Sequence, residues 1–505
     1  MKIFNASQIR DWDAFTIDRE PVSSLELMNR AAGVFTDWFT RLYPDTQRPV
    51  IVLAGTGNNG GDGVAVARLL YRRFYAPKVL VCDFSGRHSA DFDAQIANLP
   101  ADQAVPVQWL DPAGEWPDLP AGAVVIEALF GTGLSRPLEG KWAEAVEWIN
   151  RLPNEVVSID LPAGLSADAH TGGACVRADR CFSFQQPKKA FFFPENSAFA
   201  GEWTFGDIGL SPEYAAQTPT DFYYLDEAEA RNLVLPRPKF SHKGAYGHAL
   251  LVAGSRGKTG AAVLAARAVL RAGAGLLTVH CPARSLDVLQ STVPEAMCTA
   301  DSNADCWSDF LSPEHYAAVG VGPGIGTDRL TADALEQLLQ KTNRPLVLDA
   351  DALNLLAAHP EWWPLVPQNS ILTPHPKEFE RLFGPSTDDF ARNDLQRARA
   401  IERRVIVVLK GAHTAIASPD GACWFNSTGN PGMATGGSGD VLTGLLTGLL
   451  ASGYLPAQAA RLGVFLHGLA GDLAARQKSM PGMTAGDLVE AIPTAWLFLT
   501  NSRTL

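Results

Sequence analysis

No stretch of about 18 apolar residues, the length that a helix needs to cross a bilayer, occurs in the 505-residue sequence. The first residues, MKIFNASQIRDWDAF, also lack the apolar core of a signal peptide. The seven cysteines include no CxxC pair, and their odd number favours reduced, mostly buried thiols over a disulfide framework. These absences predict a cytoplasmic protein without a membrane partner.

Positive charge is also in short supply. The 42 lysines and arginines are outnumbered by 54 aspartates and glutamates, which gives a formal net charge of −12. A chain of this charge is repelled by nucleic acids and by anionic membranes, so we expect no nucleic-acid partner. An anionic ligand must then be bound by local amide groups and a few lysines.

The sequence instead shows a regular alternation of short apolar runs and helical patterns. Between the runs, segments such as DGVAVARLLYRRF have helical spacing. Alternation of this kind is typical of a parallel sheet with helices on both faces. In the first half, buried strands are predicted at 50–55, 78–84, 123–131 and 156–164.

The alternation stops at 211–240, which is rich in proline and polar residues and shows no strand pattern. It resumes in the second half, where a hairpin is predicted to turn at 419–421. A chain of this length is too long for one ordinary core, so we expect two α/β domains, 1–222 and 223–505. The strands predicted in the second half lie at 248–254, 275–282, 316–324, 345–351 and 370–376, and 404–427 is predicted to be a strand followed by the hairpin.

The segment AGTGNNGGDG follows the first predicted strand and precedes a helix. Gly55, Gly57 and Gly60 have the spacing of a dinucleotide-binding loop, and Asp83 stands where its acidic residue is expected, but this match alone is weak. A glycine-rich turn also leaves free N–H groups at the positive end of the next helix. We interpret the segment as an anion-binding loop, with a tight structural turn as the alternative.

Two further strands of the first half end in carboxylates, Glu127 and Asp160. Ligands collect at the carboxyl ends of strands in open parallel sheets, so these two residues and Asn59 are expected to meet at one site. Oxygen ligands of this kind suit a cation or acid–base chemistry. The alternative is that the acidic side chains only cap the next turn.

In this order, SSLELMNRAAG, AGTGNNGGDG, EALFGTGL, DLPAGL and QQPKKA resemble the epimerase domain of NAD(P)H-hydrate repair proteins. The resemblance covers roughly residues 1–210. It implies a Rossmann-like α/β/α sandwich that interconverts the R and S forms of hydrated NADH and NADPH. It also implies that Asp160 is the acid–base group and that Lys188 assists it.

The same resemblance implies a potassium ion held by Asn59, Glu127 and Ala163. The family usually has aspartate where Glu127 stands and serine where Ala163 stands. The residues implied to hold the hydrated nucleotide are Asn58, Asn59, Gly60, Gly61, Asp62, Gly131, Thr132, Gly133, Leu134, Ser135, Arg136 and Pro137.

Polar residues also follow strands in the second half. The segment AGSRGKTGAA is too short for a P-loop, because Gly254 stands only three positions before Gly257. His375 lies between two prolines that fix its backbone, which favours a substrate role over a purely structural one. Lys410, in LKGAHT, offers a cation to a phosphate.

Glycines crowd ahead of Asp440 in GNPGMATGGSGDVLTGLLTGLLASG, which spans 429–453. At a helix start they let successive N–H groups converge on a phosphoryl oxygen, and an adjacent aspartate can orient and deprotonate a hydroxyl. A helix-packing surface is the alternative, and it explains TGLLTGLLASG but not GGSGD. We expect the helix dipole to depress the pKa of Asp440.

Seven segments between 240 and 490, from HKGAYGHALLVAGS to GNPGMATGGSGDVLTG, resemble the dehydratase half of the same repair family, a relative of ribokinase-like kinases. The resemblance implies a ribokinase-like α/β/α domain that uses ADP, with Mg²⁺, to remove water from the S hydrate, and it implies that Asp440 is catalytic. The hydrate is assigned to Ala261, Gly324, His375 and Asp440, and the nucleotide to Lys410, Gly411, Ala412, His413, Thr414, Asn430, Gly436, Gly437, Ser438 and Gly439.

The whole chain is therefore predicted to be a bifunctional repair enzyme that acts on hydrated NADH and NADPH (NADHX and NADPHX) as a homo-oligomer. Two alternatives stay open. A ribokinase-like kinase of a small vitamin alcohol leaves the first domain without a catalytic role. A ligand-binding regulatory first domain is the other alternative; Asp160 speaks against it, whereas Ala163 leaves it open.

Overall fold

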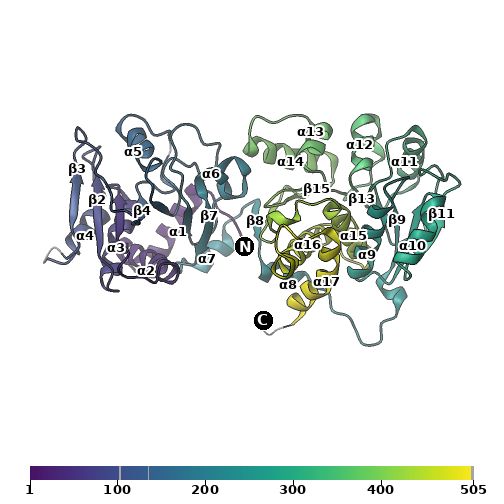
Figure 1. Ribbon diagram of the computed structural model, residues 1–505, viewed down its shortest axis with the longest axis horizontal. Coiled ribbons are helices and arrows are strands. Elements are labelled where there is room, and N and C mark those ends of the chain that lie inside the picture. The colour runs from purple at the N-terminus through teal and green to yellow at the C-terminus, as the bar shows by residue number, and fades with distance from the viewer. Residues whose placement is uncertain (102–103, 135, 502–505) are drawn as a thin grey trace. The chain divides into compact units, whose positions relative to one another are not determined.

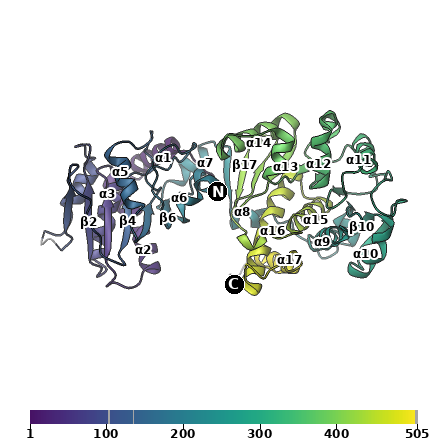
Figure 2. The same cartoon turned by 45° about the horizontal axis from the view of Figure 1, so that its top comes forward.

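The computed structural model describes residues 1–101, 104–134 and 136–501. The chain divides between Thr220 and Asp221 into two compact units, with residue 1 grouped with the second and 388–390 with the first. Each unit is built around one sheet with helices on both of its faces (Figures 1 and 2). The predicted two-domain α/β architecture is confirmed, and the boundary after residue 222 stays a prediction.

The first unit contains a parallel sheet in the order β3-β2-β1-β4-β5-β6-β7. Its order reverses between β1 and β4, the switch point at which open parallel sheets bind ligands. The loops after these two strands carry most of the predicted binding residues, so the topology brings them together. The strands are β1 (Val50–Ala54), β2 (Pro77–Cys82), β3 (Val107–Leu110), β4 (Val124–Ala128), β5 (Glu155–Ile159), β6 (Arg180–Phe184) and β7 (Glu202–Gly206).

Side chains of this sheet alternate between two apolar layers. Val52 packs in the layer formed with α2 (Ser24–Leu42) and α3 (Asn58–Tyr71), whereas Leu53 packs in the layer that includes α5 (Lys141–Ile149). Because both faces are covered, the central strand is apolar throughout, as its sequence VIVLA shows. The other helices of the unit are α1 (Ala6–Arg19), α4 (Ala90–Ala97), α6 (Ser197–Ala200) and α7 (Pro212–Gln217).

The second unit contains a sheet in the order β11-β10-β9-β12-β13-β14-β15-β16-β17-β8. The strands from β11 to β15 are parallel, and β16 and β17 form the hairpin predicted at 419–421. The strands are β8 (Phe222–Leu225), β9 (His248–Val252), β10 (Leu276–Cys281), β11 (Met297–Ala300), β12 (Ala318–Val321), β13 (Leu346–Leu348), β14 (Ile371–Leu372), β15 (Ile406–Leu409), β16 (Ala415–Ala417) and β17 (Cys423–Asn426).

The segment 211–240 differs from its prediction. It was expected to show no strand, but it contains β8, which pairs in parallel with β17 at the edge of the second sheet. The sequence of β8, FYYL, has the aromatic composition that strands favour. A run of only four such residues among prolines and polar groups is too short to show an alternation of apolar and polar residues. Only the pairing with β17 defines it as a strand.

Helix α15 (Ser438–Ala451) packs closely against α9 (Thr259–Arg271). A Cβ atom on Gly444 would meet the carbonyl oxygen of Ala265, and one on Gly448 would meet that of Val269. The TGLLTGLL part of the glycine-rich segment is therefore a helix-packing surface. The remaining helices are α8 (Glu227–Leu233), α10 (Leu286–Thr292), α11 (Arg329–Lys341), α12 (Asp351–Ala358), α13 (Pro376–Phe383), α14 (Asp389–Arg403), α16 (Pro456–Lys478) and α17 (Ala485–Thr500).

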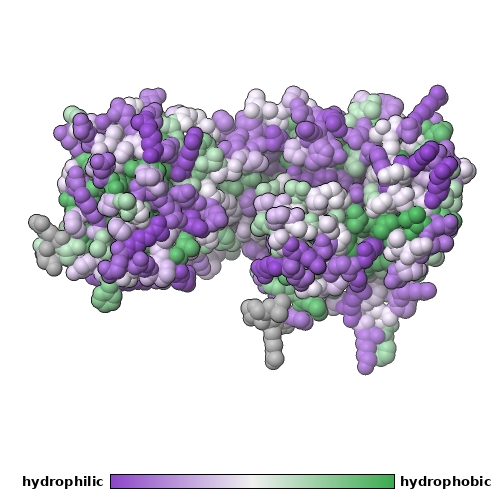
Figure 3. All heavy atoms as spheres, viewed as in Figure 1, coloured by the Kyte–Doolittle hydropathy of each residue, from purple (hydrophilic) through white to green (hydrophobic). Residues whose placement is uncertain are grey.

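Apolar residues gather in the cores of the two units rather than along surface helices. Within the described ranges, no helix is long and apolar enough to cross a membrane. Hydrophilic residues predominate on the face drawn in Figure 3, where strongly apolar residues form small groups. The seven cysteines are free thiols, five of them buried, as their number and spacing predicted.

Two candidate active sites

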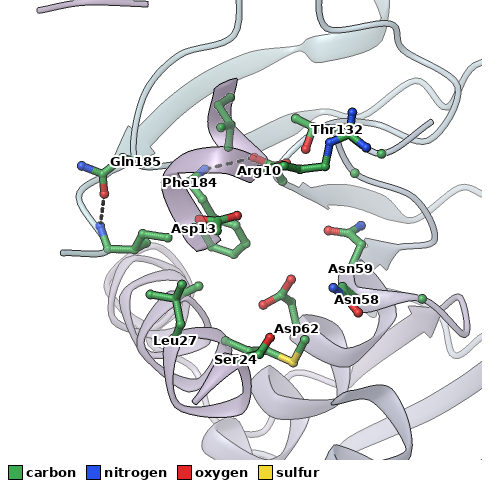
Figure 4. Close-up of a pocket in the computed structure, with 18 of the residues that line it drawn as sticks. Arg10, Asp13, Ser24, Leu27, Asn58, Asn59, Asp62, Thr132, Phe184 and Gln185 are labelled. Carbon is green, nitrogen blue, oxygen red and sulfur yellow. Dashed lines mark hydrogen bonds between the residues drawn. The ribbon is translucent and has the colours of Figure 1, made fainter. Parts of the chain in front are cut away.

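A cavity of about 580 Å³ lies at the carboxyl ends of β1, β4 and β5 (Figure 4). Its walls come from α1, α2, the start of α3, the loop after β4 and the segments that follow β5 and β6. Residues predicted from three separate motifs meet here, as the switch-point rule requires. The predicted residues that line the cavity are Asn58, Asn59, Asp62, Gly131, Thr132, Gly133, Leu134, Asp160 and Lys188.

The rest of the loop after β4 faces a neighbouring cavity. Arg136 and Pro137 line this second space of about 410 Å³, to which Leu134 also contributes. Ser135 lies outside the described residues. The predicted substrate loop is thus divided between two adjoining cavities.

Gly60 and Gly61 do not line the main cavity, and the structure gives a packing reason for both. A Cβ atom on Gly60 would strike the carbonyl of Gly55, and one on Gly61 would press against the side chain of Met28. The start of α3, with Gly57 as N-cap, has no side-chain cap. Its N–H groups are therefore available to an anion.

Asp160 has one carboxylate oxygen anchored and the other turned to the cavity. Its Oδ1 lies 2.8 Å from Nζ of Lys188 and accepts the N–H of Phe184 at 3.2 Å. A Cβ atom on Gly131 would lie 3.2 Å from Oδ2 of Asp160 and 3.2 Å from Oδ1 of Asn59, so these two oxygens converge on the same point. The backbone φ of Asp160 is +65°, a strained conformation of the kind that tertiary contacts hold at functional sites.

The ammonium group of Lys188 is directed at Asp160 and at neighbouring protein acceptors. It is 2% exposed, and its ammonium group donates to Oγ of Ser183 at 2.8 Å and to the carbonyl of Phe184 at 3.0 Å. With Asp160 as a further acceptor, the three protons of the ammonium group are used. We therefore interpret Lys188 as a positioning residue for Asp160.

The residues expected to hold potassium do not fit that ion. Oε1 of Glu127 accepts the N–H of Leu129, and Oε2 accepts the hydroxyl of Ser158 at 2.6 Å and the N–H of Ala163 at 3.1 Å. Burial raises the pKa of Glu127 to about 7, although these three donors lower it. Ala163 has no side-chain oxygen, so of the three expected ligands Asn59 alone turns a side-chain oxygen to the cavity. The described residues contain no cluster of three or more His, Cys, Asp or Glu that could hold a metal.

The cavity also contains a carboxylate that sequence analysis missed. Asp13 lies on α1 between Ile9 and Ile17, and the spacing of four residues puts all three on the face that lines the cavity. Figure 4 shows the carboxyl groups of Asp13 and Asp62 at the same space. Burial, together with Asp160, raises the pKa of Asp13 to about 7, against the lowering effect of Lys188.

Asp62 was predicted to contact phosphate, which a carboxylate repels. Burial raises the pKa of Asp62 well above its ordinary value, and Asp160 and Asp13 add to the shift. A neutral carboxylic acid can instead donate a hydrogen bond to a phosphate oxygen. The raised pKa is consistent with the phosphate role predicted for Asp62, which stays a prediction.

The second unit has a buried ion pair below the start of α15. Nζ of Lys410, after β15, lies 2.9 Å from Oδ1 of Asp349, after β13, and the hydroxyl of Thr443 donates to Oδ2 at 2.7 Å. Burial alone would raise the pKa of Asp349, but Lys410 and the hydrogen bonds lower it below its usual value. A Cβ atom on Gly439 would lie 3.6 Å from this ammonium group, so Gly439 lies directly against the pair.

The turn into α15 is open to an anion. Gly437 is the N-cap with φ +94°, where a Cβ atom would also collide with Leu264, and no side chain caps the helix. Within the described part of the chain, the buried Oγ of Ser438 has no hydrogen-bond partner. Uncapped amides and an unsatisfied hydroxyl beside Lys410 fit a phosphate.

Asp440, in the first turn of α15, differs from its predicted electrostatics. Burial and the neighbouring Asp349 raise its pKa to about 6, against the lowering effect of Lys410. The expected depression by the helix dipole is wrong, because lost hydration and a like charge outweigh it. A carboxylate with this pKa is a better general base near neutral pH.

His467 on α16 supports the same turn and was missed from the sequence. Its Nε2 lies 2.8 Å from the carbonyl oxygen of Ser438, and burial lowers its pKa to about 4. The neutral ring donates this hydrogen bond and orients the peptide that precedes Gly439. A histidine inside a long helical pattern gives no sequence signal of such a role.

Among the residues assigned to the hydrate, Gly324 and Ala261 lie side by side, whereas His375 caps a helix. Gly324, with φ +63°, lies beside Ala261, since a Cβ atom on it would come 3.3 Å from that of Ala261. His375 is the N-cap of α13, where its Nδ1 accepts the N–H groups of Lys377 and Glu378. This cap explains the histidine structurally, and its substrate role stays a prediction.

The predicted nucleotide loops are held by their own hydrogen bonds. Gly411 and Thr414 bond to each other within the loop after β15, with Ala412 and His413 between them. Nδ2 of Asn430 donates to Asp472 at 2.9 Å. Asp472, on α16, holds the loop before α15 through this bond and one from the N–H of Gly429, and neither contact follows from a sequence motif.

Two family models match the chain. One, described as NAD(P)H-hydrate dehydratase, matches residues 249–494, and the other, described as YjeF-related protein N-terminus, matches 24–190. A protein of Moorella thermoacetica named bifunctional NAD(P)H-hydrate repair enzyme is 36% identical over 528 residues, covering 98% of this chain and 96% of that protein. The chain belongs to the family of bifunctional NAD(P)H-hydrate repair enzymes.

A second relative matches nearly the whole chain, and a solved structure matches its second unit. The repair enzyme of Coxiella burnetii is 35% identical over 493 residues, covering 96% of this chain and 97% of its own. The crystal structure of an ADP/ATP-dependent NAD(P)H-hydrate dehydratase from Bacillus subtilis, co-crystallised with ATP and Mg²⁺, is similar with a TM-score of 0.50 and 33% identity. It covers 55% of this chain and 98% of that structure, and the second unit shares its ribokinase-like fold.

Proposed function

We propose that the chain epimerises the R and S forms of hydrated NADH and NADPH in its first domain, 1–222. Its second domain, 223–505, dehydrates the S form at the expense of ADP. Family membership supports both activities. The observation that carries the proposal is that each unit has its own charged site at the carboxyl ends of its strands, Asp160 with Lys188 in one and Asp349 with Lys410 in the other. Each unit therefore has groups that can act in catalysis. The kinase alternative, by contrast, requires a first domain without a catalytic role.

In the second domain, Asp440 takes the proton of the 6-hydroxyl of the hydrate as that hydroxyl attacks the terminal phosphoryl group of the nucleotide. The amides of 436–439 and the ammonium group of Lys410 stabilise the charge that develops on the phosphoryl oxygens. The phosphorylated oxygen is then a good leaving group, and the electron pair of the ring nitrogen expels it.

The acidic groups of this domain fit a magnesium ion that accompanies a nucleotide. Asp440 interacts with Asp349 and Asp351, and one or two carboxylates with substrate phosphates are the usual ligands of Mg²⁺. We propose that Asp351 and the phosphates of the nucleotide hold it, because Asp440 acts as the base. When bound, the ion neutralises phosphate charge.

In the first domain, Oδ2 of Asp160 is the acid–base atom, and Lys188 holds the opposite oxygen in place. Asn58, Asn59 and the uncapped start of α3 bind the phosphates. Potassium has no step in this proposal, because Glu127 and Ala163 do not fit it. The homo-oligomer and the cytoplasmic location expected from the sequence stay predictions.

One experiment tests both activities. The purified protein is mixed with both hydrate epimers and ADP, and recovery of the absorbance of reduced nicotinamide is followed. Rapid consumption of both epimers is expected. A stall near half would show that the first domain does not epimerise the hydrates, which favours the regulatory alternative. Phosphorylation of a vitamin alcohol with ATP without any recovery would support the kinase alternative.

A further inference from the structure

Asp13 is a carboxyl group at the proposed epimerase site that the proposed chemistry does not yet use. It lies on the cavity-lining face of α1. Among the described residues it makes no hydrogen bond and no ion pair. A polar side chain turned into a cavity without a protein partner is available to a ligand.

The charges around Asp13 come from four elements. Asp62 faces it from α3, Asp160 from the end of β5, Lys188 from the segment after β6, and Arg10 from one turn earlier on α1. The ammonium group of Lys188 lies 2.8 Å from Asp160. Three carboxyl groups thus share one cavity with Arg10 and with Lys188, which is already paired with Asp160, so charging all three carboxyl groups near neutral pH is unfavourable.

We propose that Asp13 is a second catalytic acid–base group of the epimerase, acting as the proton donor while Asp160 acts as the acceptor. This inference rests on the proposed epimerase function. Burial raises the pKa of Asp13 to about 7, so this group still carries a proton in a large share of the molecules at neutral pH. Pairs of titratable groups with such different surroundings are typical of acid–base catalysis.

The two groups act at the hydroxyl-bearing ring carbon. Asp13 gives its proton to the hydroxyl, the C–O bond breaks, and water leaves as the lone pair of the ring nitrogen forms a C=N bond. A second water adds to the other face of that carbon, its proton passes to Asp160, and the C=N electrons return to nitrogen. One water is lost and one is gained, and solvent returns the proton from Asp160 to Asp13.

The test is Asp13→Asn in the full-length protein, with Asp11→Asn, an exposed aspartate on the same helix, as the matched control. Epimerisation should fall by roughly a hundredfold in Asp13→Asn, and dehydration of the S hydrate should be unchanged in both variants. In wild type the epimerisation rate should decline as pH rises through about 7, because Asp13 loses its proton. That decline should be absent from the residual activity of Asp13→Asn and present in Asp11→Asn.

Each other outcome has a defined meaning. If Asp13→Asn loses activity but keeps the decline near pH 7, Asp13 is only structural and the proposal is overturned; a rate above a tenth of wild type also overturns it. In ¹⁸O-water each epimerisation should introduce one labelled oxygen, and retention of the original oxygen would exclude the step above. If wild type does not epimerise the hydrates at all, the proposed function fails rather than this assignment.

Discussion

Nζ of Lys410 lies 2.9 Å from Oδ1 of Asp349, and this buried pair joins the ends of two strands directly beneath the first turn of α15. Asp349 is almost fully buried and Lys410 partly so, and removing Lys410 would therefore leave an uncompensated charge in the interior. The pair is also next to an uncapped helix start, so the positive group that stabilises the fold faces the space where a phosphate would bind. The same two residues therefore serve the stability of the fold and the proposed phosphate site.

Gly439→Val should impair both nucleotide binding and dehydration. A Cβ atom at this position lies 3.6 Å from Nζ of Lys410 and 3.7 Å from Oδ2 of Asp349, so the two methyl groups of valine would occupy the approach to the pair. We expect at least a tenfold weaker nucleotide affinity by calorimetry, an order-of-magnitude figure for blocking a phosphate contact. Gly486→Ala, in the first turn of α17, is the control and should bind normally.

Asp440→Asn should lower dehydration by roughly a hundredfold or more, because the general base is lost. Nucleotide affinity should stay close to that of wild type. The wild-type rate should rise with pH through about 6, since the carboxyl group must lose its proton to act as a base. The variant should lack this rise, and a variant that keeps more than a tenth of the rate would contradict the assignment.

Asp160→Asn should reduce epimerisation by roughly a hundredfold while leaving dehydration of the S hydrate intact. The amide keeps the shape of the side chain and removes the charge that Lys188 balances. Initial rates with the pure R epimer, which must be epimerised first, measure the effect. Normal turnover of the R epimer would exclude Asp160 as the base and leave Asp13 as the first candidate.

Epimerisation should proceed at the same rate in potassium and in sodium at equal ionic strength. The carboxylate oxygens of Glu127 already accept hydrogen bonds from Leu129, Ser158 and Ala163, which leaves too few oxygen ligands for the ion. The melting temperature should likewise show no preference between the two cations. Selective activation or stabilisation by potassium would mean that Glu127 exchanges these donors for the ion.

Local pattern was enough for much of the fold. Apolar runs bounded by glycine and polar turns predicted β1, β4, β9 and β10 close to their observed bounds, because strands buried on both faces must be apolar throughout. It was not enough for β8, which is recognisable only from its pairing with β17. A four-residue strand has too few positions to show a period.

The candidate sites, like the fold, were predicted in part from local sequence and in part required tertiary contacts. The rule that ligands bind at the carboxyl ends of parallel strands places Asn59 and Asp160 together from sequence order alone. The glycines at a helix start single out Asp440 in the same way. Contacts distant in sequence decide what these groups do: Asp13 reaches the cavity from a helix outside every motif, and Ser158 takes the carboxylate expected to hold potassium.

Charge state is the property that only the tertiary structure decided. From the sequence, Asp440 stands at a helix start and its pKa should be depressed by the dipole; in the fold, burial beside Asp349 raises it to about 6. The sequence determines which groups are neighbours along the chain and at which end of the sheet they stand. How much hydration each ionisable group keeps, and which charged groups face it, depends on every element packed around it. For Asp440, the loss of hydration changes the pKa more than the helix dipole does.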